Sequence, residues 1–405
     1  MDPDRTPIFL RLSGAWGAWG LSGGAYTPFF GAWLAWKGMS PEQIGILLSA
    51  GMALRVIVPP VTGLIADARN DRRSVMIALM TLQFLGYLAL CFVAAPLAIF
   101  VFAVLANVTG TAAGPLMDSV STRLAERFGF DYGHVKRWNS ITFAIANVVS
   151  GIAVSRWGFI VLAPWLAASL ALAVTAIRLL PAPPPGRERG RLGVKLRATL
   201  AEARELTGSA AFLLFLLAAS FDQGSHAFYY GYGGLHWTQL GYSGVLIGLI
   251  WPLGVIGEAM LFSISLRLFR ALGAVRLLLF GALGCVVRWT ILAFDPPLVV
   301  VIAAQFLHAA TYALAHLGAM YFILKAVPPR LSATAQSLYV VMSSGVVTGV
   351  ATYACGPLYA AYGGRTYLLM SAMGAVAAAF ALLLGRRWHG GRVTAHDGDE
   401  IGEAI

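Results

Sequence analysis

Ionisable side chains lie inside strongly apolar stretches of this sequence, where a charge is costly and marks a candidate site. The set comprises Arg55, Asp118, Asp222, His226, Glu258, Arg288, His308 and His316. A carboxyl group removed from water favours its protonated form, and a nearby arginine favours the ionised form. Movement of a buried arginine relative to a buried carboxylate would therefore bind or release a proton, and a histidine can relay it because imidazole titrates near neutral pH. Residues of these types can link proton transfer to a conformational change.

Simpler structural roles explain the same residues. Glu258 and Arg288 can form a static buried ion pair that fixes helix packing. His316 lies two helical turns beyond His308 and is either a substrate contact or a hydrogen-bonded core residue. Trp251 lies one heptad before Glu258 on the same helical face, so we predict that it stacks on a flat part of the solute. Both kinds of interpretation remain open from these patterns.

A second candidate group lies at residues 222–230. Asp222 and His226 are four residues apart and share a helix face, and Tyr229 and Tyr230 lie three and four residues after His226. The group is either a proton or substrate site or a satisfied packing pair. The three cysteines lie singly in apolar stretches with no metal-binding spacing, so we predict no metal site and no cofactor besides the proton gradient.

The elements that carry these residues are predicted to be transmembrane helices. The 405 residues are 58% hydrophobic and 12% charged, with mean hydropathy +0.74, whereas soluble domains are about 25% charged. A membrane-spanning helix needs about 20 mostly apolar residues. Twelve stretches meet this need, which predicts an all-α polytopic membrane protein: 8–36, 43–66, 74–94, 96–122, 138–156, 160–180, 210–239, 244–266, 274–294, 296–324, 333–359 and 366–386.

The net charge of +11 comes mainly from loops on one side of these helices. With the N-terminus inside, only Lys37, Arg156 and Arg365 fall in outer segments. Basic loops stay in the cytoplasm, so we predict an inner or plasma membrane protein with both termini cytoplasmic. Insertion into a lipid bilayer explains the excess of basic residues, so the net positive charge is no indication of nucleic-acid binding.

A polar stretch at 181–208 divides the helices six and six. We predict an N-terminal bundle at 1–180, a cytoplasmic linker at 181–208, a C-terminal bundle at 209–388 and a cytoplasmic tail at 389–405. The segments IGILLSAGMALR at 44–55 and IGLIWPLGVIGE at 247–258 align with their glycines in register, as expected for a duplicated 6+6 transporter. In this register Arg55 occupies the position of Glu258.

The loop GLIADARNDRR at 63–73 resembles the signature loop of the major facilitator superfamily. This resemblance implies a gate in which Gly63, Asp67, Arg72 and Arg73 control the balance between inward- and outward-facing states. The copy departs from the family pattern at 70 and 71, where Asn and Asp replace Gly and a basic residue. An ordinary charged turn is the alternative.

Further segments resemble the phenylpropionate permease group, which belongs with the lactose permease-like proton symporters. They are DYGHVKRWNS at 131–140, QGSHAFYYG at 223–231, LGVIGE at 253–258, VVRW at 286–289 and LHAATYALAHLGAM at 307–320. The resemblance implies that Glu258, Arg288 and His308 match three residues of the lactose permease proton site. Thr311 stands where that permease carries a further proton-carrying Glu, so the coupling chemistry must use other groups.

The same resemblance implies a solute contact formed by Asp118 and Lys136, with Arg137 adjacent. We predict proton-coupled uptake of a small organic solute by a monomer, with an aromatic monocarboxylate such as phenylpropionate as the first candidate. Lys136 or Arg288 would then meet the carboxylate. A sugar or nucleoside symporter, a proton-driven efflux antiporter and a non-transporting receptor are the alternatives. The sequence shows no spacing of a nucleophile and a base, so we do not expect an enzyme.

Overall fold

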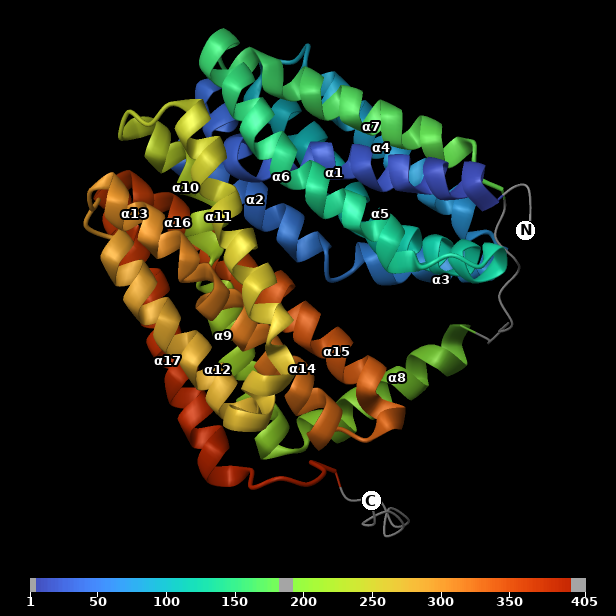
Figure 1. Cartoon of the computed structure of the whole chain (residues 1–405), viewed down its shortest axis with the longest axis vertical. Coiled ribbons are helices and arrows are strands. Elements are labelled where there is room, and N and C mark those ends of the chain that lie inside the picture. Colours follow the sequence, from blue (N-terminus) through green and yellow to red (C-terminus); the bar gives the residue numbers. More distant parts are fainter. Residues whose placement is uncertain (1–4, 182–191, 395–405) are drawn as a thin grey trace. The chain divides into compact units, whose positions relative to one another are not determined.

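The computed structural model describes residues 5–181 and 192–394, with side chains from 197 onward in the second range. All elements of these residues are helical (Figure 1). Nine of the described helices are long and apolar enough to cross a membrane, or ten if a bent pair counts as one span. The predicted twelve spans are consistent with this, because α1 (Arg5–Trp36) adds 32 residues and the helical stretch Pro329–Arg387 has 59, enough for two crossings.

The described chain forms two compact units. The first unit contains residues up to 181 together with 227–253 and 349–366, and the second unit contains 192–226, 254–348 and 367–394. Part of the predicted linker, 182–191, and part of the predicted tail, 395–405, lie outside the described residues. The boundaries of the two predicted six-helix bundles stay a prediction.

The first unit is built around α1, which packs against α6 and α7, while α4 packs against α5 and α7. Glycines allow the closest approach: a Cβ at Gly20 would lie 2.4 Å from the backbone oxygen of Asn139 in α6. Its remaining elements are α2 (Pro41–Leu54), α3 (Val58–Arg69), α4 (Arg72–Leu90), α5 (Pro96–Phe128), α6 (Tyr132–Trp157), η1 (Phe159–Val161), α7 (Leu162–Arg178), α10 (Ala227–Gln239), the start of α11 (Gly244–Ser263), most of α16 (Thr348–Tyr362) and η5 (Gly363–Thr366).

In the second unit α12 packs against α17 and α14, and α17 packs against α9. The linker prediction is refined by α8, a helix inside the predicted polar stretch. The elements are α8 (Leu192–Thr207), α9 (Ala210–Gly224), the end of α11, α12 (Ser265–Leu292), α13 (Leu298–Phe306), η2 (Ala309–Leu314), α14 (Ala315–Ala326), η3 (Pro329–Leu331), α15 (Ser332–Val340), η4 (Val341–Val347) and α17 (Tyr367–Arg387).

Several predicted spans are broken. The span predicted at 43–66 consists of α2 and α3, separated at residues 55–57. Pro59 and Pro60 have no backbone N–H to donate to the carbonyls four residues before them, so the helix cannot continue across this point. The spans predicted at 296–324 and 333–359 contain the π-helical segments η2 and η4, whose wide turns often mark functional sites.

Candidate functional site

A chain of side-chain contacts in the second unit contains three of the predicted proton-site residues. His308 lies between the other two: its Nε2 is 2.9 Å from Oε1 of Glu258, and its Nδ1 is 2.7 Å from Nη1 of Arg288. A guanidinium group can only donate hydrogen bonds. Nδ1 of neutral His308 must therefore be the acceptor, and Nε2–H donates to the Glu258 carboxylate. One contact on each ring nitrogen thus holds the histidine between the acid and the arginine.

The contact chain continues through Thr311, the residue in place of the lactose permease glutamate. Arg288 donates from Nη1 to the Thr311 hydroxyl at 3.3 Å and from Nη2 to Oε1 of Gln305 at 3.1 Å. Nε2 of His226 lies 3.1 Å from the Thr311 hydroxyl. Nδ1 of His226 must donate to the Asp222 carbonyl oxygen, so Nε2 of the neutral ring accepts from the Thr311 hydroxyl. The same hydroxyl proton can also point to the His308 carbonyl oxygen at 3.4 Å. The structure thus joins His226 to the predicted Glu258 group through a neutral hydroxyl.

Local backbone features place His308 within reach of Glu258. His308 directly precedes the π-helical segment η2, which contains Thr311. A Cβ at Gly254 of α11 would lie 2.9 Å from Cδ2 of His308, so only a glycine lets α11 approach this closely. The sequence analysis noted Gly254 as a glycine of the repeated segment, but nothing in the sequence indicated that it packs against His308.

Asp222 is fully buried beside Cys285, whose thiol lies 3.5 Å from Oδ1, while Oδ2 has no hydrogen-bond partner among the described residues. Ligand atoms of Asp222, His226 and Cys285 lie within 4.8 Å of one another. Both ring nitrogens of His226 are already engaged, Nδ1 with the Asp222 carbonyl oxygen at 3.2 Å and Nε2 with Thr311. The geometry therefore fits a hydrogen-bonded polar cluster better than a metal site. Sequence spacing did not indicate Cys285, which α12 contributes.

The predicted aromatic contacts lie in the first unit. Tyr229 stacks on Trp251 with ring centroids 4.5 Å apart, and Tyr230 lies 5.5 Å from Tyr229. Both Tyr229 and Trp251 are almost fully buried by this packing. His316 belongs to the second unit, where it stacks on Tyr312 at 6.1 Å. The structure thus gives each of these residues an aromatic neighbour, and a solute contact at them stays a prediction.

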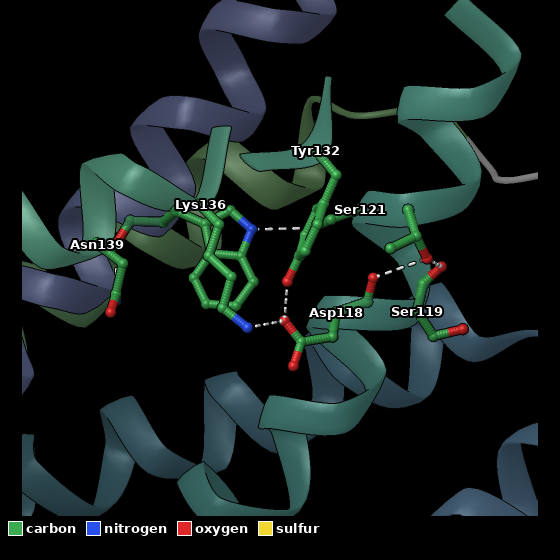
Figure 2. A network of polar contacts seen from close by, with 8 residues as sticks. Asp118, Ser119, Ser121, Tyr132, Lys136 and Asn139 are labelled. Carbon is green, nitrogen blue, oxygen red and sulfur yellow. Dashed lines mark hydrogen bonds and ion pairs between the residues drawn. The ribbon is translucent and has the colours of Figure 1, made fainter. Parts of the chain in front are cut away.

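Asp118 and Lys136 form the ion pair that the sequence resemblance implies (Figure 2). Lys136 Nζ lies 2.7 Å from Asp118 Oδ1, and the Tyr132 hydroxyl donates to the same oxygen. Lys136 also lies over the ring of Trp16 at 5.1 Å. Both ends of the pair are nearly half-exposed, at 46% and 43% of their side-chain surface. Arg137 is exposed and makes no hydrogen bond or ion pair within the described chain.

The predicted gate loop joins several helices of the first unit. Arg72 donates to Asp67 at 2.7 Å and also to the hydroxyl of Ser119 in α5. Arg73 donates to the backbone oxygen of Arg178 at the end of α7, at 2.8 Å. Gly63 has open space around its Cα. The loop therefore ties α3 and α4 to α5 and α7.

The two departures from the family loop have local causes. Asn70 has φ 49°, in the left-handed region that favours glycine and tolerates asparagine. Asp71 is the N-cap of α4, and its Oδ1 accepts a hydrogen bond from the backbone N–H of Ser74 at 2.9 Å. Hydrogen bonding from the side chain and the backbone N–H of Ser74 holds the pKa of the Asp71 carboxyl below its ordinary value. The departures thus preserve the turn and add a helix cap.

A cavity of about 330 Å³ in the first unit was not predicted. Arg55, at the break between α2 and α3, lines it together with the aromatic side chains of Trp16, Trp19, Tyr26, Tyr87 and Phe143. In the sequence, Arg55 stands out as an intramembrane charge without an assigned role. One feature of the sequence could have indicated the cavity: Pro59 and Pro60 follow Arg55 closely within an apolar stretch.

Apolar helices long enough to cross a membrane, with ionisable side chains buried among them, are typical of polytopic membrane transporters. Residues 21–370 match the family described as MFS_1 like. The chain belongs to this family of the major facilitator superfamily, as the sequence resemblance predicted.

The comparisons with individual proteins agree. The chain is 31% identical to a probable 3-phenylpropionic acid transporter of Escherichia coli (strain K12), over 86% of this chain and 90% of that one. It is 29% identical to the maltose permease of Geobacillus stearothermophilus, over 90% and 91%. The fold resembles that of the nucleoside transporter NupG, with TM-score 0.79 at 16% identity and coverage of 94% and 99%. These relatives indicate a small-molecule solute.

Proposed function

We propose that this protein is a proton-coupled symporter that takes up an aromatic monocarboxylate across the inner membrane, with both termini in the cytoplasm. The observation that carries proton coupling is the hydrogen-bonded chain from Glu258 through His308 to Arg288 and on to Thr311 and His226. The solute class is supported by the relative that is described as a probable 3-phenylpropionic acid transporter.

The charges of Glu258, His308 and Arg288 suggest how proton binding is coupled to solute binding. With Glu258 ionised, His308 neutral and Arg288 charged, the three groups carry no net charge. A proton on Glu258 removes the negative charge that strengthens the His308 Nε2–H bond and leaves one uncompensated positive charge on the buried Arg288, which is unfavourable. An anionic solute that binds with the proton cancels the added charge of the loaded transporter as a whole, so proton and solute favour the same conformational state. Thr311 and His226 join the same hydrogen-bonded group on the other side of Arg288, whose guanidinium stays protonated.

The gate loop is the proposed control of that conformational state. The Asp67–Arg72 pair and the Arg73 bond to α7 stabilise one arrangement of the helix ends in the first unit. Loss of these contacts would shift the balance between inward- and outward-facing states.

Uptake of labelled 3-phenylpropionate into proteoliposomes tests the proposal. We expect accumulation above the external concentration only when the lumen is more alkaline than the outside, and loss of accumulation when a protonophore is added. Entry that ignores the pH gradient would contradict symport. Export of lipophilic cations from the same vesicles would favour the antiporter.

A sugar symporter is the second candidate, because Asp118, Lys136 and the Trp16 ring form a charged and aromatic group of the kind that binds sugars, and because the maltose permease is a relative. The same vesicles separate the two candidates. Gradient-driven uptake of maltose, without uptake of 3-phenylpropionate, would select the sugar.

A further inference from the structure

Arg55 is held in the first unit by a break in its helix. The backbone N–H of Arg55 donates to the carbonyl oxygen of Met52, three residues earlier, and the N–H groups of the next two residues also donate to carbonyls three residues earlier. Helix α3 then starts at Val58. Pro59 and Pro60 leave the carbonyls of residues 55 and 56 without helical partners. Interrupted helices line solute sites in transporters because their free backbone groups need a polar cavity. The break therefore belongs to a place that receives a polar ligand.

The polar atoms of the cavity are not satisfied by the described residues. Nε of Arg55 is buried without a hydrogen-bond partner among them, and so are Oε1 of Gln83 and Oδ1 of Asn107. The Asn107 amide donates to the Tyr26 hydroxyl at 2.9 Å, which fixes the direction of its unpartnered oxygen. Buried polar groups are normally paired. The Arg55 guanidinium needs an acceptor from outside the described residues, and the two amide oxygens need hydrogen-bond donors.

The charge of the residues that line the cavity determines which charge a bound ligand should carry. Of the residues that line it, Arg55 alone is charged, and no carboxylate of the described chain pairs with it. Asp118, the acidic candidate that the sequence places in the same unit, is already paired with Lys136 and Tyr132. An uncompensated guanidinium attracts an anion and repels a cation, and its planar fork matches a carboxylate.

The uncharged side chains that line the cavity indicate the chemistry of the remaining part of the ligand. Trp19, Tyr26, Tyr87 and Phe143 present aromatic rings, and a Cβ at Gly114 would already lie 3.3 Å from the Trp19 ring. Aromatic pairs add attraction beyond simple burial. The volume of about 330 Å³ is at the small end of ligand pockets. A compact aryl group with a short acidic side chain fits these conditions.

We propose that Arg55 binds the carboxylate of the transported solute and that the aromatic walls of this cavity hold its ring. The solute class rests on the proposed function. Solute binding then belongs to the first unit, and the proton chain belongs to the second. Arg288, the sequence-based candidate for the carboxylate, is instead occupied by His308, Thr311 and Gln305.

The test is equilibrium binding to the purified protein without any gradient. The probes are 3-phenylpropionate and its neutral isostere 3-phenylpropionamide. A charge-assisted hydrogen bond lost from a buried site corresponds to about ten- to hundred-fold in affinity. We expect Arg55→Gln to lose about this factor for the acid, with little change for the amide, so that the preference for the acid disappears.

Two further variants keep the test decisive. Arg55→Lys retains the charge without the fork and should show an intermediate loss for the acid, which matters if Arg55→Gln does not fold. Arg156→Gln removes an exposed arginine outside the cavity and should bind like the wild type. Thermal denaturation identifies any variant that is misfolded.

The outcomes separate this inference from the proposed function. Unchanged acid affinity in folded Arg55→Gln overturns the cavity assignment and leaves aromatic acid symport intact. Arg55-dependent binding of the acid, without proton-driven uptake in vesicles, supports the cavity and overturns symport. If the wild type binds neither probe, both the solute class and the cavity assignment fail.

Discussion

Glu258 is the residue whose environment is most informative, because one hydrogen bond joins it to a histidine whose tautomer is fixed by an arginine. A resemblance to known permeases identified Glu258, Arg288 and His308 from the sequence. Gln305, Cys285 and the cavity role of Arg55 were missed. Their partners lie far away in the sequence, and apolar periodicity carries no information about which side chains meet across helices.

Replacing Glu258 tests its role in coupling. Glu258→Gln keeps the shape of the side chain and can still accept a bond from His308, but it cannot take up a proton. We expect gradient-driven accumulation to fall to simple equilibration while exchange of internal for external solute continues. Glu42→Gln, which changes a carboxylate in the first turn of α2, is the control and should accumulate normally. Full uphill accumulation by Glu258→Gln would remove Glu258 from the coupling role.

At the scale of the element, hydropathy predicted where helices lie but not where they break. The pair Pro59–Pro60 carried a readable signal for the break between α2 and α3. The π-helical segments η2 and η4 carried none, since one extra residue in a turn does not alter an apolar pattern. In the gate loop, the departures at Asn70 and Asp71 became understandable only when the turn and the cap of α4 were visible.

The cap of α4 gives a prediction on stability. Asp71→Ala removes the acceptor for Ser74 N–H and should lower the stability of the protein at neutral pH by about 0.5–2 kcal/mol. Asp71→Asn keeps a good capping side chain and should lose much less. Because folding lowers the pKa of Asp71, its ionised form adds stability above the ordinary carboxyl pKa, and this is lost as the pH falls through the lowered value.

Thermal denaturation of the three proteins in detergent measures this effect. The difference between wild type and Asp71→Ala should shrink on acidification. An equal difference at neutral and acidic pH would show that the carboxylate charge does not contribute to the cap.

At the scale of the whole molecule, the sequence predicted the class, the family and a helix count consistent with the structure. It did not predict that residues 227–253 and 349–366 join the first compact unit. Membership of a unit depends on which helix faces pack, as where a Cβ at Gly234 would lie 1.7 Å from the backbone oxygen of Pro28. A single glycine in a sequence indicates close packing but does not name the partner.

The contact chain of the second unit contains one carboxylate, Glu258, and this has an electrical consequence. One proton entering with one monocarboxylate moves no net charge across the membrane. A membrane potential contributes about 2.3 kcal/mol per 100 mV only to charge that moves. A potassium diffusion potential, negative inside, should therefore drive no accumulation of 3-phenylpropionate without a pH gradient, whereas a pH gradient at zero voltage should. Accumulation driven by voltage alone would require a second proton per cycle and a carrier for it besides Glu258.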